Sequence, residues 1–335
     1  MYENKKILIT GGTGTIGYNL TKRLLQENPA VIRIFSRDEY KQFNMSQDFQ
    51  KDKYRMRYLI GDVRDQQRLV RAMEGIDYVF HLAAMKHVPF CEYNPFEAVQ
   101  TNVLGTQNVI QAAIQAGVKK VLFTSSDKAI SPTNTYGATK LTAERLISAA
   151  EYQKGPKETV FSSVRFGNVM GSRGSVIPLF KKQILEDRCI TITDLNMIRY
   201  MMTPSQAINL MLKANLMSKG GEVFVLKMPV VRLMDLAEIL REEISSKYNL
   251  DITEIIIKEV GLRPGEKMYE ELMTNDEMRI ALETQDLYIV PSTFSEKQWH
   301  EGNENLFKAR NPEMNEPSLI SKDVLKDWLI TENLL

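Results

Sequence analysis

The chain has 335 residues, with 43 Lys and Arg against 42 Asp and Glu, so its formal net charge is +1. This length allows one large or two moderate domains with a sizeable core. The near-neutral balance excludes the strong positive field that a nucleic acid or an acidic membrane surface requires.

Cysteine usage and hydropathy indicate the compartment. Cys91 and Cys189 lie far apart without CxxC spacing, which is typical of a reducing environment. No stretch approaches the ~20 apolar residues of a membrane span. The apolar run at 7–9 is too short for a signal sequence. We therefore expect a soluble cytoplasmic protein with no nucleic-acid and no membrane partner.

Strand and helix patterns alternate through the first half of the chain. Short apolar runs predict strands at 7–10, 32–35, 57–60, 78–82, 120–124 and 160–165. Amphipathic patterns predict helices at 16–26, 66–73, 96–115 and 136–152. Each parallel crossover must carry a helix over the sheet, so this order predicts an α/β fold with a doubly wound parallel sheet of the Rossmann type.

The pattern becomes less regular after residue 166, where a loop at 167–178 contains Gly, Ser and Pro. We place a domain junction there. The first domain is 1–167, completed by a returning segment near 200–228, and the second is a smaller mixed α/β domain at 168–335. Later elements are predicted as strands at 222–226 and 254–259 and helices at 179–186, 233–246 and 321–329.

A glycine-rich turn, Thr10-Gly11-Gly12-Thr13-Gly14-Thr15-Ile16-Gly17, follows the first strand and opens the first helix. Gly11 permits the tight turn, Gly14 lets the backbone approach a pyrophosphate, and Gly17 lets helix and strand pack closely. A glycine loop without ligand is the plain alternative, but the flanking strand and helix favour a dinucleotide site. The predicted contacts here are Gly11, Thr13, Gly14, Thr15, Ile16 and Gly17.

The end of the second strand bears on cofactor choice. Ser36 and Arg37 offer a hydroxyl and a guanidinium to a 2′-phosphate, with Lys41 as a helper, so NADP is favoured. Asp38 keeps NAD as an alternative cofactor. An error of one or two residues in the predicted end of this strand would bring the Asp38 carboxylate to the ribose. Asp62, with Val63, follows the third strand and is placed either to meet the adenine or as an ordinary turn residue.

Tyr136 and Lys140 stand four residues apart, on one face of a predicted helix. An ammonium beside a phenol favours the phenolate, but lowering a phenol pKa from ~10 to ~7 takes about 4 kcal/mol. An exposed ion pair supplies only ~0.2 to 1 kcal/mol. A positively charged nicotinamide in a water-poor site must therefore contribute. A half-buried Tyr with a surface Lys is the plain alternative.

Asp127 and Lys128 precede this helix and follow Ser125 and Ser126. They add an acid and a base that a plain dehydrogenase does not need. A surface ion pair beside a strand end is the alternative interpretation.

Together these motifs resemble an extended short-chain dehydrogenase/reductase. More narrowly, five stretches resemble the UDP-N-acetylglucosamine 4,6-dehydratases of bacterial surface-sugar pathways, namely 83–89, 92–95, 126–129, 165–176 and 261–267. The likeness runs to about residue 275. Tyr136 stands where the membrane-anchored, configuration-retaining enzymes have Met, so the resemblance is to the short, inverting type, which also epimerises C5.

The resemblance implies a lyase that makes UDP-2-acetamido-2,6-dideoxy-β-L-arabino-hex-4-ulose. Tyr136, assisted by Ser126 or Ser125, would take the C4 hydroxyl proton while hydride passes to NADP⁺. Lys128, if neutral, would remove the C5 proton, its pKa lowered by the cofactor charge and Lys140. Asp127, if protonated, would donate to the leaving C6 hydroxyl. The implied catalytic residues are Asp127, Lys128, Tyr136, Lys140 and Ser126.

The resemblance also implies binding contacts. Ala83, Ala84, Lys86, Tyr136 and Lys140 would join the cofactor site. The nucleotide sugar would occupy domain 168–335 and meet Lys86, His87, Asn168, Arg173, Ser175, Val176, Thr193, Arg199, Arg263 and Glu266, with no metal. For His87 a role in fixing its loop is at least as well supported as a catalytic one. A homo-oligomer, from dimer to hexamer, is expected.

Two departures from the family pattern are Ser126, where Thr is usual, and Ile198, which replaces a Thr near the nucleotide pocket. Three alternatives stay open. A retaining 4,6-dehydratase is one of them. A UDP-hexose 4-epimerase or a reductase would use Tyr136 and Lys140 without Asp127 and Lys128. An NADP-binding scaffold would tolerate loss of Tyr136.

Overall fold

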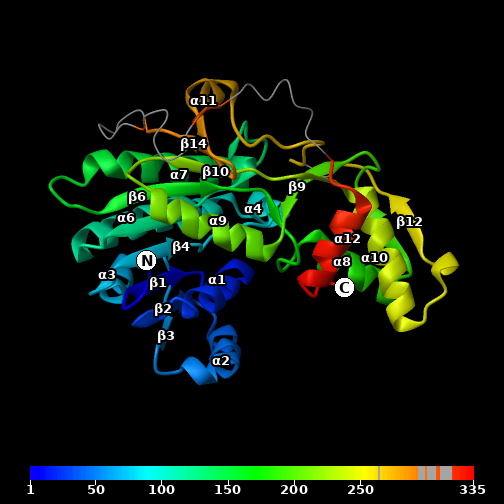
Figure 1. Ribbon diagram of the computed structural model, residues 1–335, viewed down its shortest axis with the longest axis horizontal. Coiled ribbons are helices and arrows are strands. Elements are labelled where there is room, and N and C mark those ends of the chain that lie inside the picture. The colour runs from blue at the N-terminus through cyan, green and yellow to red at the C-terminus, as the bar shows by residue number, and fades with distance from the viewer. Residues whose placement is uncertain (263–264, 293–298, 300–306, 310–318) are drawn as a thin grey trace.

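The computed structural model describes residues 1–262, 265–292, 299, 307–309 and 319–335. A ten-stranded sheet runs through the larger part of the molecule (Figure 1), in the order β15-β13-β14-β10-β6-β5-β4-β1-β2-β3. Its strands are β1 Lys6–Thr10, β2 Val31–Ser36, β3 Met56–Ile60, β4 Tyr78–His81, β5 Lys120–Thr124, β6 Val160–Arg165, β10 Val223–Leu226, β13 Leu282–Glu283, β14 Leu287–Val290 and β15 Phe307–Lys308.

The strands from β10 to β3 are parallel to their neighbours. β14, β13 and β15 then extend the sheet beyond β10 in antiparallel pairing. All six strands predicted in the first half are present, and the predicted fold class is confirmed: helices cross over both faces of a mostly parallel sheet.

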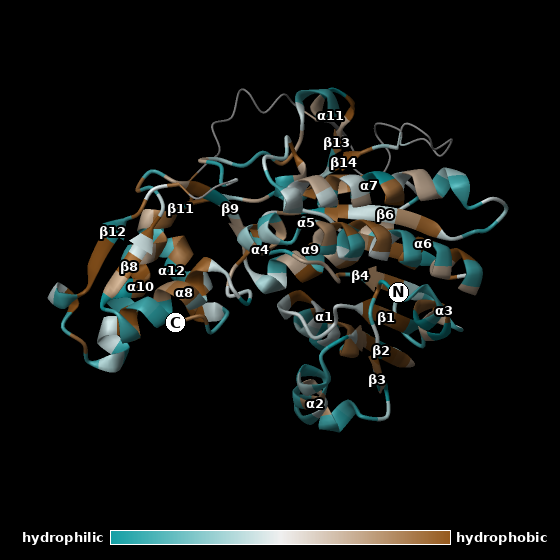
Figure 2. Cartoon of the chain, turned by 180° about the vertical axis from the view of Figure 1, so that it is seen from behind, coloured by the Kyte–Doolittle hydropathy of each residue, from teal (hydrophilic) through white to brown (hydrophobic). Residues whose placement is uncertain are grey.

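Helices cover the two faces of the sheet because alternate strand residues point to opposite sides. Ile7 and Ile9 pack with helices α1, α2 and α9, whereas Leu8 between them packs with α3, α6 and α7. Figure 2 shows that the central strands β1 and β2 are mostly apolar, whereas the helices around the sheet carry both polar and apolar residues. The helices of this part are α1 Thr15–Leu25, α2 Glu39–Asp48, α3 Gln66–Met73, α4 Val88–Tyr93, α5 Pro95–Ala98, α6 Gly105–Ala116, α7 Thr135–Gln153, α9 Pro204–Met217 and α11 Asn275–Ile280, with 3₁₀ turns η1 Gln50–Asp52 and η3 Asp127–Ala129.

A smaller part lies beside the main sheet and has its own apolar cluster, which includes Phe180, Ile190, Leu236 and Leu325. It contains two small sheets, of order β11-β9-β7 and β12-β8. Its elements are β7 Asn168–Val169, β8 Cys189–Ile192, β9 Ile198–Met202, β11 Val230–Arg232, β12 Ile256–Glu259, α8 Val176–Glu186, α10 Leu233–Tyr248, α12 Lys322–Thr331 and the 3₁₀ turn η4 Ile252–Glu254. The domain division at residue 167 stays a prediction.

The predicted single helix at 96–115 is wrong in detail. The segment contains α5, a π-helical stretch η2 at Val99–Leu104, and then α6. Inside the π-helical stretch, the Asn102 side chain bonds the backbone N–H and C=O of Met85 at 2.8 and 2.9 Å and the Thr139 hydroxyl at 3.0 Å. A π-helical turn contains more residues than an α-helical turn, so it changes the direction of the side chains around it. Such turns are frequent at functional sites.

Other differences are smaller. α8 begins at Val176, three residues before the predicted start, because Pro178 is tolerated in a first helical turn. The strand predicted at 254–259 begins at Ile256, after η4. Helices α2, α4, α9 and α11 were not predicted.

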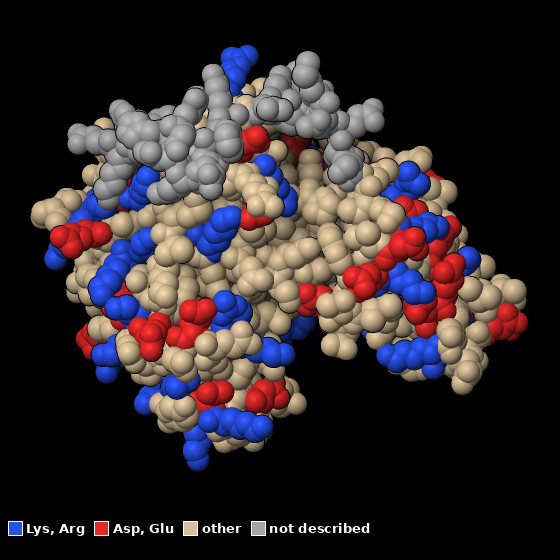
Figure 3. Space-filling view, in the orientation of Figure 1, with Lys and Arg blue, Asp and Glu red and all other residues tan. Residues whose placement is uncertain are grey.

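The surface of the described residues carries charges of both signs, as the net charge of +1 predicts. Lys and Arg are interspersed with Asp and Glu on the face drawn in Figure 3. None of the helices in the described ranges combines the length and the apolar character that crossing a bilayer requires.

Candidate active site

The glycine-rich turn joins β1 to α1 and has the geometry of an anion site. Gly11 adopts φ +68°, and a Cβ there would lie 2.8 Å from the backbone nitrogen of Ala83. Gly17 packs so closely that a Cβ would lie 2.5 Å from the Gly12 Cα. Gly14 caps α1 without a side-chain hydrogen bond, and the first turn has no acidic residue. The helix N-terminus therefore keeps N–H groups and a positive dipole end for a phosphate.

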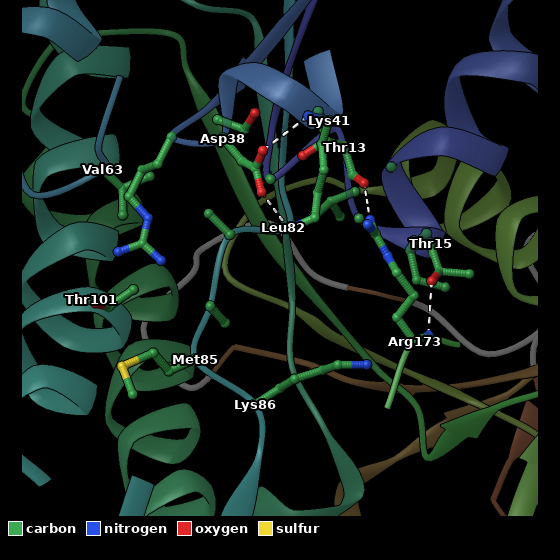
Figure 4. A pocket seen from close by; sticks show the side chains of 18 of the residues that line it. Thr13, Thr15, Asp38, Lys41, Val63, Leu82, Met85, Lys86, Thr101 and Arg173 are labelled. Carbon is green, nitrogen blue, oxygen red and sulfur yellow. Dashed lines mark hydrogen bonds and ion pairs between the residues drawn. The ribbon is translucent and has the colours of Figure 1, made fainter. Parts of the chain in front are cut away.

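A cavity of about 900 Å³ opens over this turn. Figure 4 shows its wall, which is built from the ends of β1, β2, β3 and β4. It is lined by all the predicted cofactor residues of the strand ends and the glycine turn: Gly11, Thr13, Gly14, Thr15, Ile16, Gly17, Ser36, Arg37, Asp62, Val63, Ala83, Ala84 and Lys86. The structure thus brings these predicted residues together at the carboxyl edge of the sheet.

The far end of the cavity carries the residues that bear on cofactor choice. The Asp38 carboxylate accepts a hydrogen bond from the Lys41 backbone N–H at 2.9 Å, which caps α2, and pairs with Lys41 Nζ at 2.5 Å. The Lys41 bonds hold the pKa of the Asp38 carboxyl below its usual value. Arg37 is more exposed and lies 3.8 Å from Asp62. Asp38 and Arg37 both line the cavity, and Asp38 also caps α2.

Arg173 was predicted to meet the substrate, and the structure places it against the glycine turn instead. Its guanidinium donates to the Thr13 carbonyl, and its backbone N–H donates to the Thr15 hydroxyl at 3.1 Å. It reaches the cavity from the loop between β7 and α8. The smaller part of the molecule thus contributes a cation to the phosphate end of the cavity.

Tyr136 lies in the first turn of α7, which Asn134 caps through a 2.8 Å bond from the Gly137 N–H. Burial raises the pKa of the Tyr136 phenol, and its hydrogen bond with Ser126 and the nearby Lys128 charge oppose that shift. The phenol of the free protein therefore keeps its proton at neutral pH. This direction agrees with the expectation that a bound positive group is needed to form the phenolate.

Lys140 is buried at 3% exposure, and its Nζ lies 4.1 Å from the centre of the Phe123 ring. Burial lowers the Lys140 pKa to about 7, although Glu144 acts in the opposite direction. In the part of the chain that the structure describes, no hydrogen bond joins Lys140 to Tyr136.

Asp127 and Lys128 form the 3₁₀ turn η3 just beyond β5. Asp127 Oδ1 accepts from the Ser126 hydroxyl at 3.0 Å, from the Lys128 backbone N–H at 2.8 Å and from Lys128 Nζ at 3.1 Å. Its second oxygen, Oδ2, is buried without a partner among the described residues, and a Cβ at Gly167 would lie 2.7 Å from it. The alternative of a surface ion pair is wrong, because the Asp127 side chain is 1% exposed.

The structure adds a residue that sequence reasoning missed. Glu270 Oε1 lies 3.5 Å from Lys128 Nζ. Burial alone would lower the pKa of Lys128, but Asp127 and Glu270 outweigh it and raise that pKa. In the free protein Lys128 is therefore an ammonium between Asp127 and Glu270, and the expected lowering of its pKa when a cationic cofactor is bound stays a prediction.

The remaining predicted substrate residues are dispersed. His87 lines the cavity, and a Cβ at Gly174 would lie 2.2 Å from its ring. Arg199 is buried and bonds Glu266 and the carbonyls of Ile198, Lys267 and Met268, so it holds backbone rather than facing an open pocket. Arg263 lies outside the described residues. The cavity wall does not include Asn168, Ser175, Val176, Thr193, Arg199 or Glu266.

Within the described ranges, no group of three or more His, Cys, Asp or Glu side chains is arranged to hold a metal ion.

The sequence matches the model of a polysaccharide biosynthesis protein family over residues 7–292. An inverting UDP-N-acetylglucosamine 4,6-dehydratase of Campylobacter jejuni is 41% identical over 100% of this chain and 97% of its own length. A UDP-glucose 4-epimerase of Rickettsia conorii is 42% identical over 87% of this chain and 84% of its own. An uncharacterized membrane protein of Methanocaldococcus jannaschii is 50% identical over 86% of each chain.

Among solved structures, the protein Pen from Bacillus thuringiensis is 56% identical to this chain. The two superpose with a TM-score of 0.90 over 100% of this chain and 99% of the other. The likeness thus extends across both parts of the molecule.

Proposed function

Because this chain belongs to the polysaccharide biosynthesis protein family and is an extended short-chain dehydrogenase/reductase, we propose that it is a UDP-N-acetylglucosamine 4,6-dehydratase that inverts C5. The product is UDP-2-acetamido-2,6-dideoxy-β-L-arabino-hex-4-ulose. The reaction oxidises C4, eliminates water across C5 and C6, and returns hydride to C6.

One observation carries this proposal. Asp127 and Lys128 are bonded to each other at 3.1 Å, and the Tyr136 phenol shares Ser126 with Asp127. Oxidation at C4 requires a group such as Tyr136, whereas elimination of water also requires an acid and a base at C5 and C6. A cluster that holds all of these groups beyond one strand end suits dehydration.

The cofactor proposed is NADP, with NAD as the alternative. The glycine turn, the uncapped α1 N-terminus and Arg173 suit a pyrophosphate. Ser36, Arg37 and Lys41, which line the cavity, would hold a 2′-phosphate. A nicotinamide held by these residues would supply the hydride chemistry, as acceptor at C4 and donor at C6.

The protein residues move the protons. Tyr136 takes the C4 hydroxyl proton, and Ser126 hydrogen-bonds that oxygen. Lys128 as an amine removes the C5 proton, which the C4 ketone has made acidic. Asp127 must carry a proton before it can donate one to the departing C6 hydroxyl, and C5 is then protonated from the opposite face. Because Lys128 is an ammonium in the free protein, it must lose its proton before it acts on C5.

The 4-epimerase relatives make a UDP-hexose 4-epimerase the second candidate. Such an enzyme uses Tyr136 and Lys140 but has no step for Asp127 and Lys128. A retaining dehydratase would keep the elimination and return the C5 proton to its original face. A scaffold that binds NADP without turnover has no use for the buried Tyr136–Ser126 contact.

The test is to incubate the protein with NADP⁺ and UDP-N-acetylglucosamine and to follow the sugar by proton NMR. The dehydratase predicts a new C6 methyl signal and loss of one water by mass. A galacto product with intact mass would favour the epimerase. No product with cofactor bound would favour the scaffold.

A further inference from the structure

A carboxylate from a distant part of the chain completes the surroundings of Lys128. Glu270 Oε1 lies 3.5 Å from the same Nζ that Asp127 Oδ1 contacts at 3.1 Å. The Glu270 side chain is 4% exposed, and its other oxygen, Oε2, has no partner among the described residues. Burying a carboxylate with an unpartnered oxygen is costly. A structural ion pair alone does not account for that placement.

Glu270 belongs to a bracing segment, residues 265–272, that is fastened to the loop between Lys128 and α7. Thr133 and Asn134 donate to the Gly265 carbonyl at 3.1 and 3.0 Å. Lys267 Nζ donates to the Ile130 carbonyl at 3.0 Å. The bracing segment is therefore tied to both sides of the turn that carries the reacting groups.

Two buried guanidinium groups fix the bracing segment from behind. Arg199 donates to the carbonyls of Lys267 and Met268 at 2.8 and 2.9 Å. Arg165, fully buried at the end of β6, donates to the Leu272 carbonyl at 2.9 Å. Anchored at these points, Glu270 does not have to be ordered each time Lys128 reacts.

We propose that Glu270 is a positioning residue that controls the proton of Lys128, a role that rests on the proposed dehydration and deepens it. In the free protein, the Glu270 carboxylate holds the Lys128 ammonium against Asp127. When substrate is bound, one N–H bond of that ammonium breaks and an O–H bond forms on Glu270, which leaves a neutral amine. The amine then takes the C5 proton and becomes an ammonium again, while the first proton stays on Glu270 until it is released to solvent at the end of the turnover.

The charges around the pair support this exchange. Burial raises the pKa of the Glu270 carboxyl, and Lys128 only partly opposes that shift. A carboxyl with a raised pKa accepts a proton readily. The other charged or titratable groups that face the pair are Asp127, Tyr136, Arg199 and Lys267.

The first test is the pH dependence of dehydration in Glu270→Gln, Glu270→Asp and Glu271→Gln. Glu271 is the exposed neighbour, so its substitution removes the same charge one residue along. Glu270→Gln is expected to lower kcat about tenfold to hundredfold at neutral pH. Activity should then recover as pH rises, because solvent can take the Lys128 proton instead. Glu270→Asp and Glu271→Gln should keep the wild-type profile.

A Glu270→Gln profile that runs parallel to that of the wild type would overturn the proposal. The second test needs no substrate: trace acetic anhydride labels amines in the unprotonated form, and mass spectrometry of the Lys128 peptide follows its titration. Glu270→Gln should shift Lys128 labelling to lower pH, because one of its two carboxylates is gone, whereas Glu271→Gln should not.

An unshifted Lys128 titration in Glu270→Gln would overturn the pairing itself. If the wild-type protein does not dehydrate UDP-N-acetylglucosamine, the proposed function fails. The labelling result still decides whether Glu270 controls Lys128.

Discussion

The cofactor cavity and the cluster of Asp127, Lys128 and Glu270 adjoin the same edge of the sheet, but they are built by different means. Backbone makes the cavity: a turn that requires glycine at Gly11 and Gly17 and a helix N-terminus without a cap. Side chains from positions 127, 128 and 270 make the cluster. A site built from backbone is specified by a few neighbouring residues, whereas a site built from side chains depends on how distant segments dock.

The largest expected effect is on the side-chain cluster. Lys128→Ala should lower dehydration by about three to four orders of magnitude, the upper range for a general base. NADPH affinity, followed by fluorescence titration, should stay near the wild-type value because Lys128 does not line the cavity. Lys182→Ala, at a side chain that is 65% exposed, is the control and should change neither quantity. Retained dehydration in Lys128→Ala would refute its role as the base.

The pH dependence of the unfolding free energy tests whether the Lys140 side chain is shielded from water, as its burial indicates. The folded pKa is about 7, whereas an unfolded Lys titrates near ~10.4. Between these values the unfolded chain binds more protons, so the free energy of unfolding should rise with pH, by at most about 1.4 kcal/mol per unit. Urea unfolding at several pH values should show that Lys140→Met lacks this rise, while Lys182→Met retains it. Parallel curves for Lys140→Met and wild type would show that Lys140 is hydrated.

Gly17→Ala tests the backbone site. The added Cβ would lie 2.5 Å from Gly12, so the turn must shift. We expect a loss of about 1–3 kcal/mol in unfolding free energy, together with weaker NADPH binding. Gly155→Ala is the control, because that glycine has φ +62° but no atom within 4 Å of the new Cβ. Gly155→Ala should lose stability, because Ala is strained at positive φ, and should keep its cofactor affinity. Equal losses of NADPH affinity in Gly17→Ala and Gly155→Ala would contradict the account of the turn.

Arg37→Ala should have the smallest effect, since this side chain is 61% exposed. The ratio of NADP to NAD affinity should fall about tenfold, or ~1.4 kcal/mol, because a 2′-phosphate loses one guanidinium. Arg71→Ala, on the exposed side of α3, is the control. An unchanged ratio in Arg37→Ala would remove the proposed basis for NADP preference.

The same contrast explains which features could be predicted from sequence. Local patterns predict the alternating strands, the glycine turn and helices α1, α3 and α7, because hydrophobic period and glycine position act within a few residues. The break in the helix at 96–115 could not be predicted, since Asn102 meets Met85 and Thr139 only in the folded chain. The contact between Arg173 and the glycine turn could not be predicted either, because docking of the smaller part sets the distance between them.

Glu270 shows the limit most clearly. It stands beside Glu271 in the sequence, and no local pattern tells the two apart. Arg199, Lys267 and the loop at 130–134 orient one carboxylate toward Lys128 and leave the other exposed. Only long-range packing makes that choice.

The central claim is that the protein moves protons at C5 in addition to oxidising C4. The most direct measurement is the reaction of UDP-N-acetylglucosamine with the protein and NADP⁺ in heavy water, with proton NMR of the product. The account predicts a C6 methyl group, deuterium at C5 and the L-arabino configuration. A product that keeps the original hydrogen at C5 would contradict it.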